Sequence, residues 1–89
     1  MRAIVTVVAK DSVGIIAYIS AILADKGVNV MDISQTLMQE YFTMIMLVDL
    51  TSAGCEFDEL RETLRQKGEE RGLIIRFQRE DIFNAMFRV

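Results

Sequence analysis

The stretch AKDSVGIIAYISAIL, residues 9–23, decides the fold class because it joins two apolar patterns of different period. Residues 2–9, RAIVTVVA, are β-branched and nearly all apolar, which predicts a buried strand. Beyond a short polar turn, apolar residues recur at the spacing of one helix face, which predicts a helix from Gly14 to Lys26 that ends at Gly27. The apolar positions of that helix are Ile15, Ile19, Ile22 and Leu23.

The rest of the chain extends this strand–helix unit into a complete sandwich. It predicts strands at 28–38 and 41–50 joined by a turn at Gln39 and Glu40, a helix over about 56–71, a strand at 73–78, and a helical tail at 79–89. Two βαβ halves with right-handed crossovers predict an α+β, ferredoxin-like fold. Its four-stranded antiparallel sheet has the order 4-1-3-2, with two helices on one face and strand 28–38 at an edge. We expect residues 1–89 to form a single domain.

Inward-facing residues follow from the same periodicities. In the second helix they are Phe57, Leu60 and Leu64, and in the last strand Leu73, Ile75 and Phe77. In the tail, helical spacing relates Ile82, Phe83, Met86 and Phe87. The methionines at 31, 38, 44 and 46 are interpreted as core or interface filler.

Composition indicates a subunit interface. Hydrophobic residues make up 52% of the chain and mean hydropathy is +0.28, which is high for a small monomer. A domain of this size buries only roughly 60% of its unfolded surface. We therefore expect a homodimer that pairs through the edge strand 28–38.

The chain shows no signal for a membrane or for export. No apolar run reaches the roughly 20 residues that span a bilayer, and no secretory signal pattern is present. Cys55 is the single cysteine, so no internal disulfide forms. These features predict a cytoplasmic protein.

The net charge and the absence of histidine disfavour several classes of function. A net charge of −3 and a sequence pI near 4.8 argue against nucleic-acid binding. No histidine is present, which removes the commonest general base, the usual zinc ligand and every Ser-His or Cys-His pair. We expect no enzyme activity, no cofactor and no metal, although carboxylates or lysine remain available for catalysis.

Two short motifs resemble the ACT domain, a ferredoxin-like module that senses amino acids in metabolic enzymes and regulators. The family's D-x-x-G-[IVL] turn appears as Asp11-Ser12-Val13-Gly14-Ile15, and its asparagine near the second strand appears as Asn29-Val30. The resemblance covers about residues 4–78. DISQTLM, FTMIMLVDL and EDIFNAM are similar to stand-alone ACT proteins of bacteria and archaea.

The chain departs from the family pattern at two positions. Val13 stands where many ACT turns carry proline, and Phe87 stands where the stand-alone proteins often carry histidine. The first departure leaves the turn less rigidly preset. The second weakens any chemical role for the tail.

The resemblance implies a regulatory homodimer that binds a small amino acid or a similar small anion. The first helix amides, near Gly14, Ile15 and Ile16, favour the carboxylate, and Asp11 or Asn29 would take the ammonium. The candidate ligand-binding residues are Asp11, Ser12, Gly14, Ile15, Asn29, Val30, Asp32 and Ile33.

Simpler interpretations of these residues stay open. Asp11 or Ser12 can merely cap the helix, and Asn29 can merely satisfy turn backbone. Asp32 can be a solvent-side charge that protects an edge strand.

Other functions share this topology. A protein–protein module, in which the dimer and the tail are the whole function, is poorly separated from the first hypothesis. An unidentified regulated protein is a further expected partner. An acylphosphatase-type enzyme needs an arginine beside an anion-binding loop after the first strand, where Lys10 is the only cation. An RNA-binding sheet is disfavoured by the acidic pI and by a first strand without aromatics, and a metal-transfer domain by the absence of Cys-x-x-Cys.

Overall fold

The computed structural model describes residues 1–10 and 13–86, apart from the side chains of residues 38, 83, 85 and 86. Its elements are β1 (Arg2–Ala9), α1 (Ile15–Asp25), β2 (Asn29–Met38), β3 (Tyr41–Asp49), α2 (Phe57–Glu70), β4 (Ile74–Arg79) and α3 (Glu80–Met86). The strands pair antiparallel in the order β2-β3-β1-β4, which confirms the predicted order 4-1-3-2 read from the other edge. Within the described ranges, no helix combines the length and apolarity needed to cross a bilayer.

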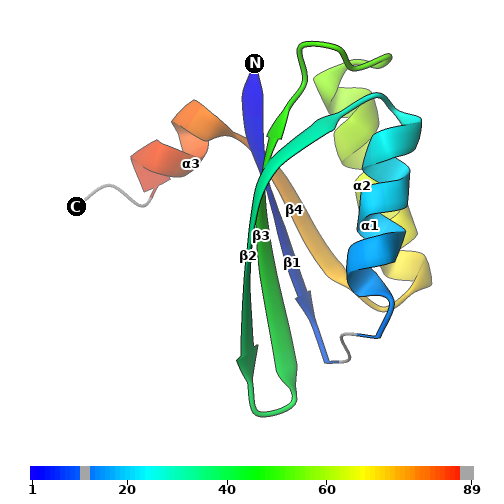
Figure 1. The fold of residues 1–89 in the computed structure, drawn as a ribbon, viewed down its shortest axis with the longest axis vertical. Coiled ribbons are helices and arrows are strands. Elements are labelled where there is room, and N and C mark those ends of the chain that lie inside the picture. Colours follow the sequence, from blue (N-terminus) through cyan, green and yellow to red (C-terminus); the bar gives the residue numbers. More distant parts are fainter. Residues whose placement is uncertain (11–12, 87–89) are drawn as a thin grey trace.

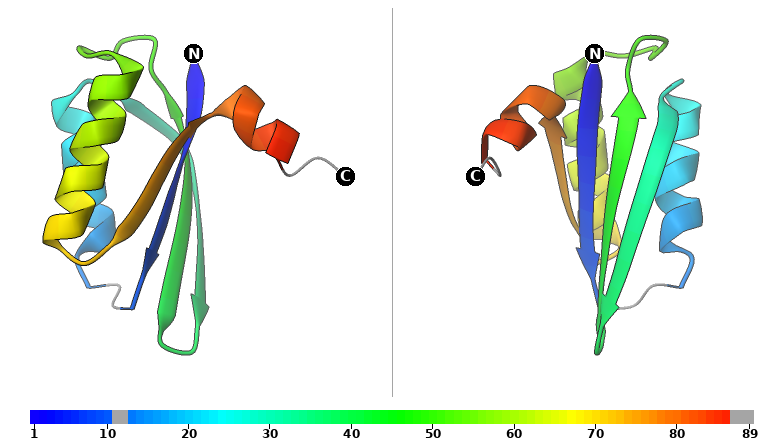
Figure 2. Two further views of the ribbon diagram at one scale, coloured as in Figure 1. Left: turned by 180° about the vertical axis from the view of Figure 1, so that it is seen from behind. Right: turned by 60° about the vertical axis from the view of Figure 1, so that its left-hand side comes forward.

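The sheet has one covered face and one open face (Figures 1 and 2). Helices α1 and α2 lie together on the covered face, as predicted, while α3 leaves the end of β4 on the opposite side. Two hydrogen bonds hold α3 against β1, from Arg2 Nε to Glu80 Oε1 at 3.1 Å and from Arg2 Nη2 to Glu80 Oε2 at 2.6 Å. The helical tail is thus confirmed for residues 80–86, and Phe87 lies outside the described residues.

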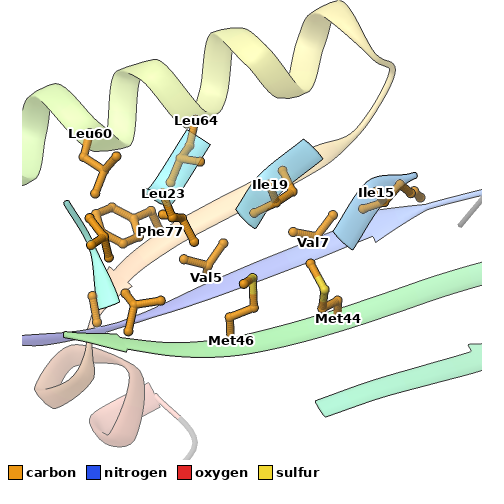
Figure 3. Packing of buried hydrophobic residues seen from close by; sticks show 14 of the residues in the cluster. Val5, Val7, Ile15, Ile19, Leu23, Met44, Met46, Leu60, Leu64 and Phe77 are labelled. Atoms are coloured by element: carbon orange, nitrogen blue, oxygen red, sulfur yellow. The ribbon is translucent and has the colours of Figure 1, made fainter. Parts of the chain in front are cut away.

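The core lies between the covered face and the two helices (Figure 3). Alternate residues of β1 and β3 point into it, and Val5, Val7, Met44 and Met46 are fully buried. On the other side of the core, α1 contributes Ile19 and Leu23, and α2 contributes Leu60 and Leu64. Each such side chain contributes about 1.5–3 kcal/mol by leaving water.

Two sequence interpretations of the core are refined by the structure. Met44 and Met46 are core residues as expected, whereas Met31 is exposed on β2. Phe57 is half-buried and stacks on Phe77, with ring centroids 4.6 Å apart. The aromatic pair closes the end of the core between α2 and β4.

A polar turn follows β3, beyond the edge of the core. The Thr51 hydroxyl donates to Asp49 Oδ1 at 2.6 Å, and the Thr51 amide donates to the same oxygen at 2.9 Å. These bonds, the hydroxyl first and the amide second, hold the pKa of Asp49 below its ordinary value. The ionised carboxylate therefore stabilises this turn.

We expect Thr51→Ala to raise the pKa of Asp49 toward its ordinary value, because the hydroxyl donor is lost and the amide donor stays. The folded pKa of Asp49 lies below the unfolded one, so its contribution to stability is present above the unfolded pKa and is lost as pH falls through the folded pKa. NMR titration of the Asp49 carboxyl carbon measures the shift. Thr63→Ala is the control, because the Thr63 hydroxyl donates to the Glu59 carbonyl instead. An unchanged Asp49 titration in Thr51→Ala would contradict the assignment.

Candidate functional site

The junction between β1 and α1 is built around a glycine with left-handed backbone. Gly14 has φ 71° and ψ 1° and is the N-cap residue of α1, a conformation that glycine adopts without strain. The first backbone bond of the helix runs from the Tyr18 amide to the Gly14 carbonyl at 2.9 Å. The amides of Ile15, Ile16 and Ala17 therefore have no acceptor within the helix, which makes them donors for an anion.

The structure describes only some of the ligand-binding residues predicted in this turn. Asp11 and Ser12 lie outside the described residues, so their predicted roles are untested. Ile15 is placed with its side chain buried in the core, where it holds the start of α1 against the sheet. Only the backbone amide of Ile15 is therefore available to a ligand.

Arg71 joins this turn from a distant part of the chain. It follows the last turn of α2, and its Nη2 lies 3.9 Å from the position that a Cβ on Gly14 would occupy. The guanidinium lies over the ring of Tyr18, 4.2 Å from its centroid, and the Tyr18 hydroxyl donates to the Lys67 carbonyl at 3.1 Å. The expectation that Lys10 is the only cation beside this turn is therefore incomplete.

The second half of the predicted site is the start of β2. Asn29 pairs opposite Asp49, and Met31 is the extra residue of a bulge, so Asp32 pairs with Leu47 and Ile33 with Met46. Since Met46 faces the core, Ile33 lies on the covered face and Asp32 on the open face. The Asp32 carboxylate is exposed and accepts a hydrogen bond from the Ile33 amide at 2.9 Å. Val30 is half-buried against the core and cannot offer its side chain to solvent freely.

One chain does not bring the two halves together. Gly14 stands at the start of α1 and Asn29 follows its end (Figure 1). Eleven helical residues separate them, which corresponds to about 16 Å along the axis. The predicted residues therefore form two partial sites at opposite ends of α1.

A hollow of about 320 Å³ lies beside the first turn of α1. Ile16, Gln35, Leu37 and Phe42 line it. Leu37 is 70% exposed although its partner Phe42 is buried, because β2 extends beyond the area that α1 covers. The far end of β2, rather than its start, therefore neighbours the α1 N-terminus within one chain.

The described part of the chain gathers no group of three or more Cys, Asp or Glu side chains that could hold a metal ion. Cys55 is half-buried in the loop before α2, as a free thiol.

These features define a ferredoxin-like domain with an open glycine turn at its first helix. The sequence pattern of the ACT domain matches residues 2–78, and the chain belongs to the ACT domain family. A UPF0237 protein of Clostridium acetobutylicum is 55% identical over 89 residues, covering 100% of both chains. A UPF0237 protein of Methanopyrus kandleri is 48% identical over 88 residues, covering 99% of this chain and 98% of that one.

A solved structure shows the same fold. The ACT domain protein from Streptococcus pneumoniae superposes with a TM-score of 0.83 at 41% identity, covering 98% of each chain. The resemblance to ACT proteins of bacteria and archaea that consist of this one domain is thereby confirmed.

Proposed function

We propose that this protein is a regulatory module that binds a small amino acid or a similar small anion at the β1–α1 junction. In this proposal it acts as a homodimer through β2 and catalyses no reaction. The observation that carries the proposal is the left-handed Gly14 turn before the first amides of α1, which have no acceptor within the helix, in a chain of the ACT family. The likeness to amino-acid-sensing ACT domains supplies the ligand class.

The carboxylate of the ligand would bind the amides of Ile15 and Ile16. Arg71 supports this position, because its guanidinium approaches the same turn and adds positive charge to the helix N-terminus. Asp11 or Asn29 would receive the ammonium. Hydrogen bonds to charged groups of this kind contribute about 1.5–3 kcal/mol each.

A homodimer would join the two partial sites. Identical strands related by a two-fold axis pair antiparallel, so the start of one β2 meets the far end of the other. That far end lines the hollow beside the α1 N-terminus, so the partner's Asn29–Ile33 segment would approach it. Exposed apolar side chains on β2, an edge strand, support this pairing: Met31, Ile33 and Leu37.

Two alternative functions are each supported by one observation in the structure. A protein–protein module without a ligand would use the same exposed β2, and ligand binding separates it from the proposal. An acylphosphatase-like enzyme is favoured by the approach of Arg71 to the β1–α1 turn. Turnover of an acyl phosphate that is lost in both Lys10→Ala and Arg71→Ala would support that enzyme over the proposal.

We expect one or a few amino acids to stabilise the protein in a thermal-shift screen, by roughly 2.7 kcal/mol at 100 times Kd. With such a ligand, calorimetry should show at least tenfold weaker binding to Asp11→Ala, since about 1.4 kcal/mol is a factor of ten. Asp58→Ala, which removes an exposed acid from the first turn of α2, should bind normally. Stability is measured beside affinity, because loss of a helix cap costs about 1 kcal/mol. Absence of stabilisation by any amino acid would contradict the proposal.

A further inference from the structure

The open face of the sheet is largely aliphatic along its centre, with Thr6 and Thr43 as the polar members of β1 and β3. Five aliphatic side chains lie on it, in alternation with the buried residues of β1 and β3 and at the start of β4: Ile4, Val8, Ile45, Leu47 and Ile74. Ile45 is 37% exposed and Ile74 is 61% exposed. Helix α3 stands on this side of the sheet only at the end where β4 finishes (Figure 1). Exposed apolar side chains that gather on one face of a sheet favour a protein contact there.

Away from the end covered by α3, where Arg2 of β1 and Asp49 of β3 pair opposite each other, the charges on this face lie at its two edges and have opposite sign. Asp32 belongs to β2, and Arg76 belongs to β4, where it pairs opposite Thr6. Asp32 lies directly opposite Leu47 in the strand pairing, and Arg76 is aligned across β1 with Ile45. The two charges are therefore offset along the strands by one side-chain position on this face. Three strand spacings separate β2 from β4, about 14 Å, so the two charges cannot pair within one chain. Among the described residues Arg76 has no ion pair.

We propose that the open face binds the open face of a second copy of this chain, about a two-fold axis parallel to the strands. That axis lays β2 of each copy over β4 of the other, which brings each Asp32 toward the other copy's Arg76. Stacked sheets pack about 10 Å apart, with their strands inclined by about 30°. The long Arg76 side chain spans the offset along the strands that remains between it and the other copy's Asp32.

The charge pattern selects this axis over the alternative. A two-fold axis across the strands would lay β2 over β2 and β4 over β4, placing Asp32 near Asp32 and Arg76 near Arg76. Like charges in a desolvated contact are unfavourable, so that arrangement is disfavoured. The face is therefore complementary to itself in one orientation.

This contact is separate from edge pairing through β2, because it uses a face of the sheet and not its edge. Both contacts together would give a tetramer, and the face contact alone would give a dimer. Helix α3, held by the Arg2–Glu80 pair, would flank the partner sheet with its exposed Ile82.

The test is the solution mass of charge-reversal variants, measured by equilibrium sedimentation at tens of micromolar protein. Arg76→Glu and Asp32→Arg should each halve the mass of the wild type, and the double variant Asp32→Arg/Arg76→Glu should restore it. Ile45→Arg should halve the mass without rescue. Arg61→Glu is the matched control, because it makes the same change on the outer side of α2 and should leave the mass unchanged.

Each outcome decides the proposal. A fall from tetramer to dimer supports both contacts, and a fall from dimer to monomer supports the face contact alone. A monomeric wild type overturns the face contact. A wild-type dimer whose mass is unchanged by Arg76→Glu and Ile45→Arg also overturns it, and such a dimer would be consistent with edge pairing through β2. A double variant as dissociated as the single ones overturns the strand-parallel axis. Circular dichroism checks that each variant is folded, and if Asp32→Arg is not, Arg76→Glu and Ile45→Arg decide between the same outcomes.

Discussion

Gly14→Val is expected to abolish ligand binding while leaving the chain folded. The valine side chain would stand at the N-terminus of α1 and beside Arg71. A Cβ at this position meets Arg71 Nη2 at 3.9 Å, which is an ordinary contact and the nearest one among the described residues. The backbone is strained instead, because φ of 71° is left-handed, at a cost of roughly 1–2 kcal/mol for a residue with a side chain.

The variant Gly14→Asn separates the effect of backbone strain from the effect of a side chain that blocks the ligand. Asparagine tolerates left-handed backbone far better than valine, yet it also places a side chain before the helix amides. We expect calorimetry to show binding lost in both variants, with a smaller loss of stability in Gly14→Asn. Unchanged affinity in Gly14→Asn would show that the space before α1 is not occupied by the ligand, and the junction would then be only a turn.

The fold could be predicted from the sequence because its decisive signals are local. The alternation through Val5 and Val7 and the helical spacing of Ile15 and Ile19 each report burial within a few residues of chain. Chain order and crossover handedness then leave few topologies. Predicted element ends therefore differ from the observed ones by a residue or two.

The site was only partly predictable because its contacts are not local. Arg71 reaches Gly14 through the packing of two helices from different βαβ halves, which no residue spacing encodes. The bulge at Met31 reassigns the faces of all later residues in β2, and the sequence carries no turn residue that announces it. The family resemblance groups Asn29 with Gly14, whereas the single chain separates them by the length of α1.

The sharpest test of the fold itself is at Gly27, where the predicted end of α1 meets a second loop. Gly27 has φ 74°, and a Cβ there would lie 2.9 Å from the backbone carbonyl oxygen of Ser52. The two loops are also tied by a hydrogen bond from the Gly54 amide to the Lys26 carbonyl at 2.8 Å. The neighbour is backbone and cannot rotate away, so a side chain at Gly27 must separate the loops.

Gly27→Ala should therefore lower the free energy of unfolding by about 3 kcal/mol, from roughly 1–2 kcal/mol of left-handed strain and 1–3 kcal/mol of overpacking. A domain of this size has about 5–15 kcal/mol in total, so the loss is a large share. Gly72→Ala isolates the strain, because Gly72 has φ 70° and no described atom lies within 4 Å of its Cβ position. Denaturant unfolding of both variants, at one protein concentration because self-association adds stability, should show the greater loss at Gly27. Equal losses would mean that the loop at Ser52 yields freely, and close packing of the two loops would then contribute nothing to the fold.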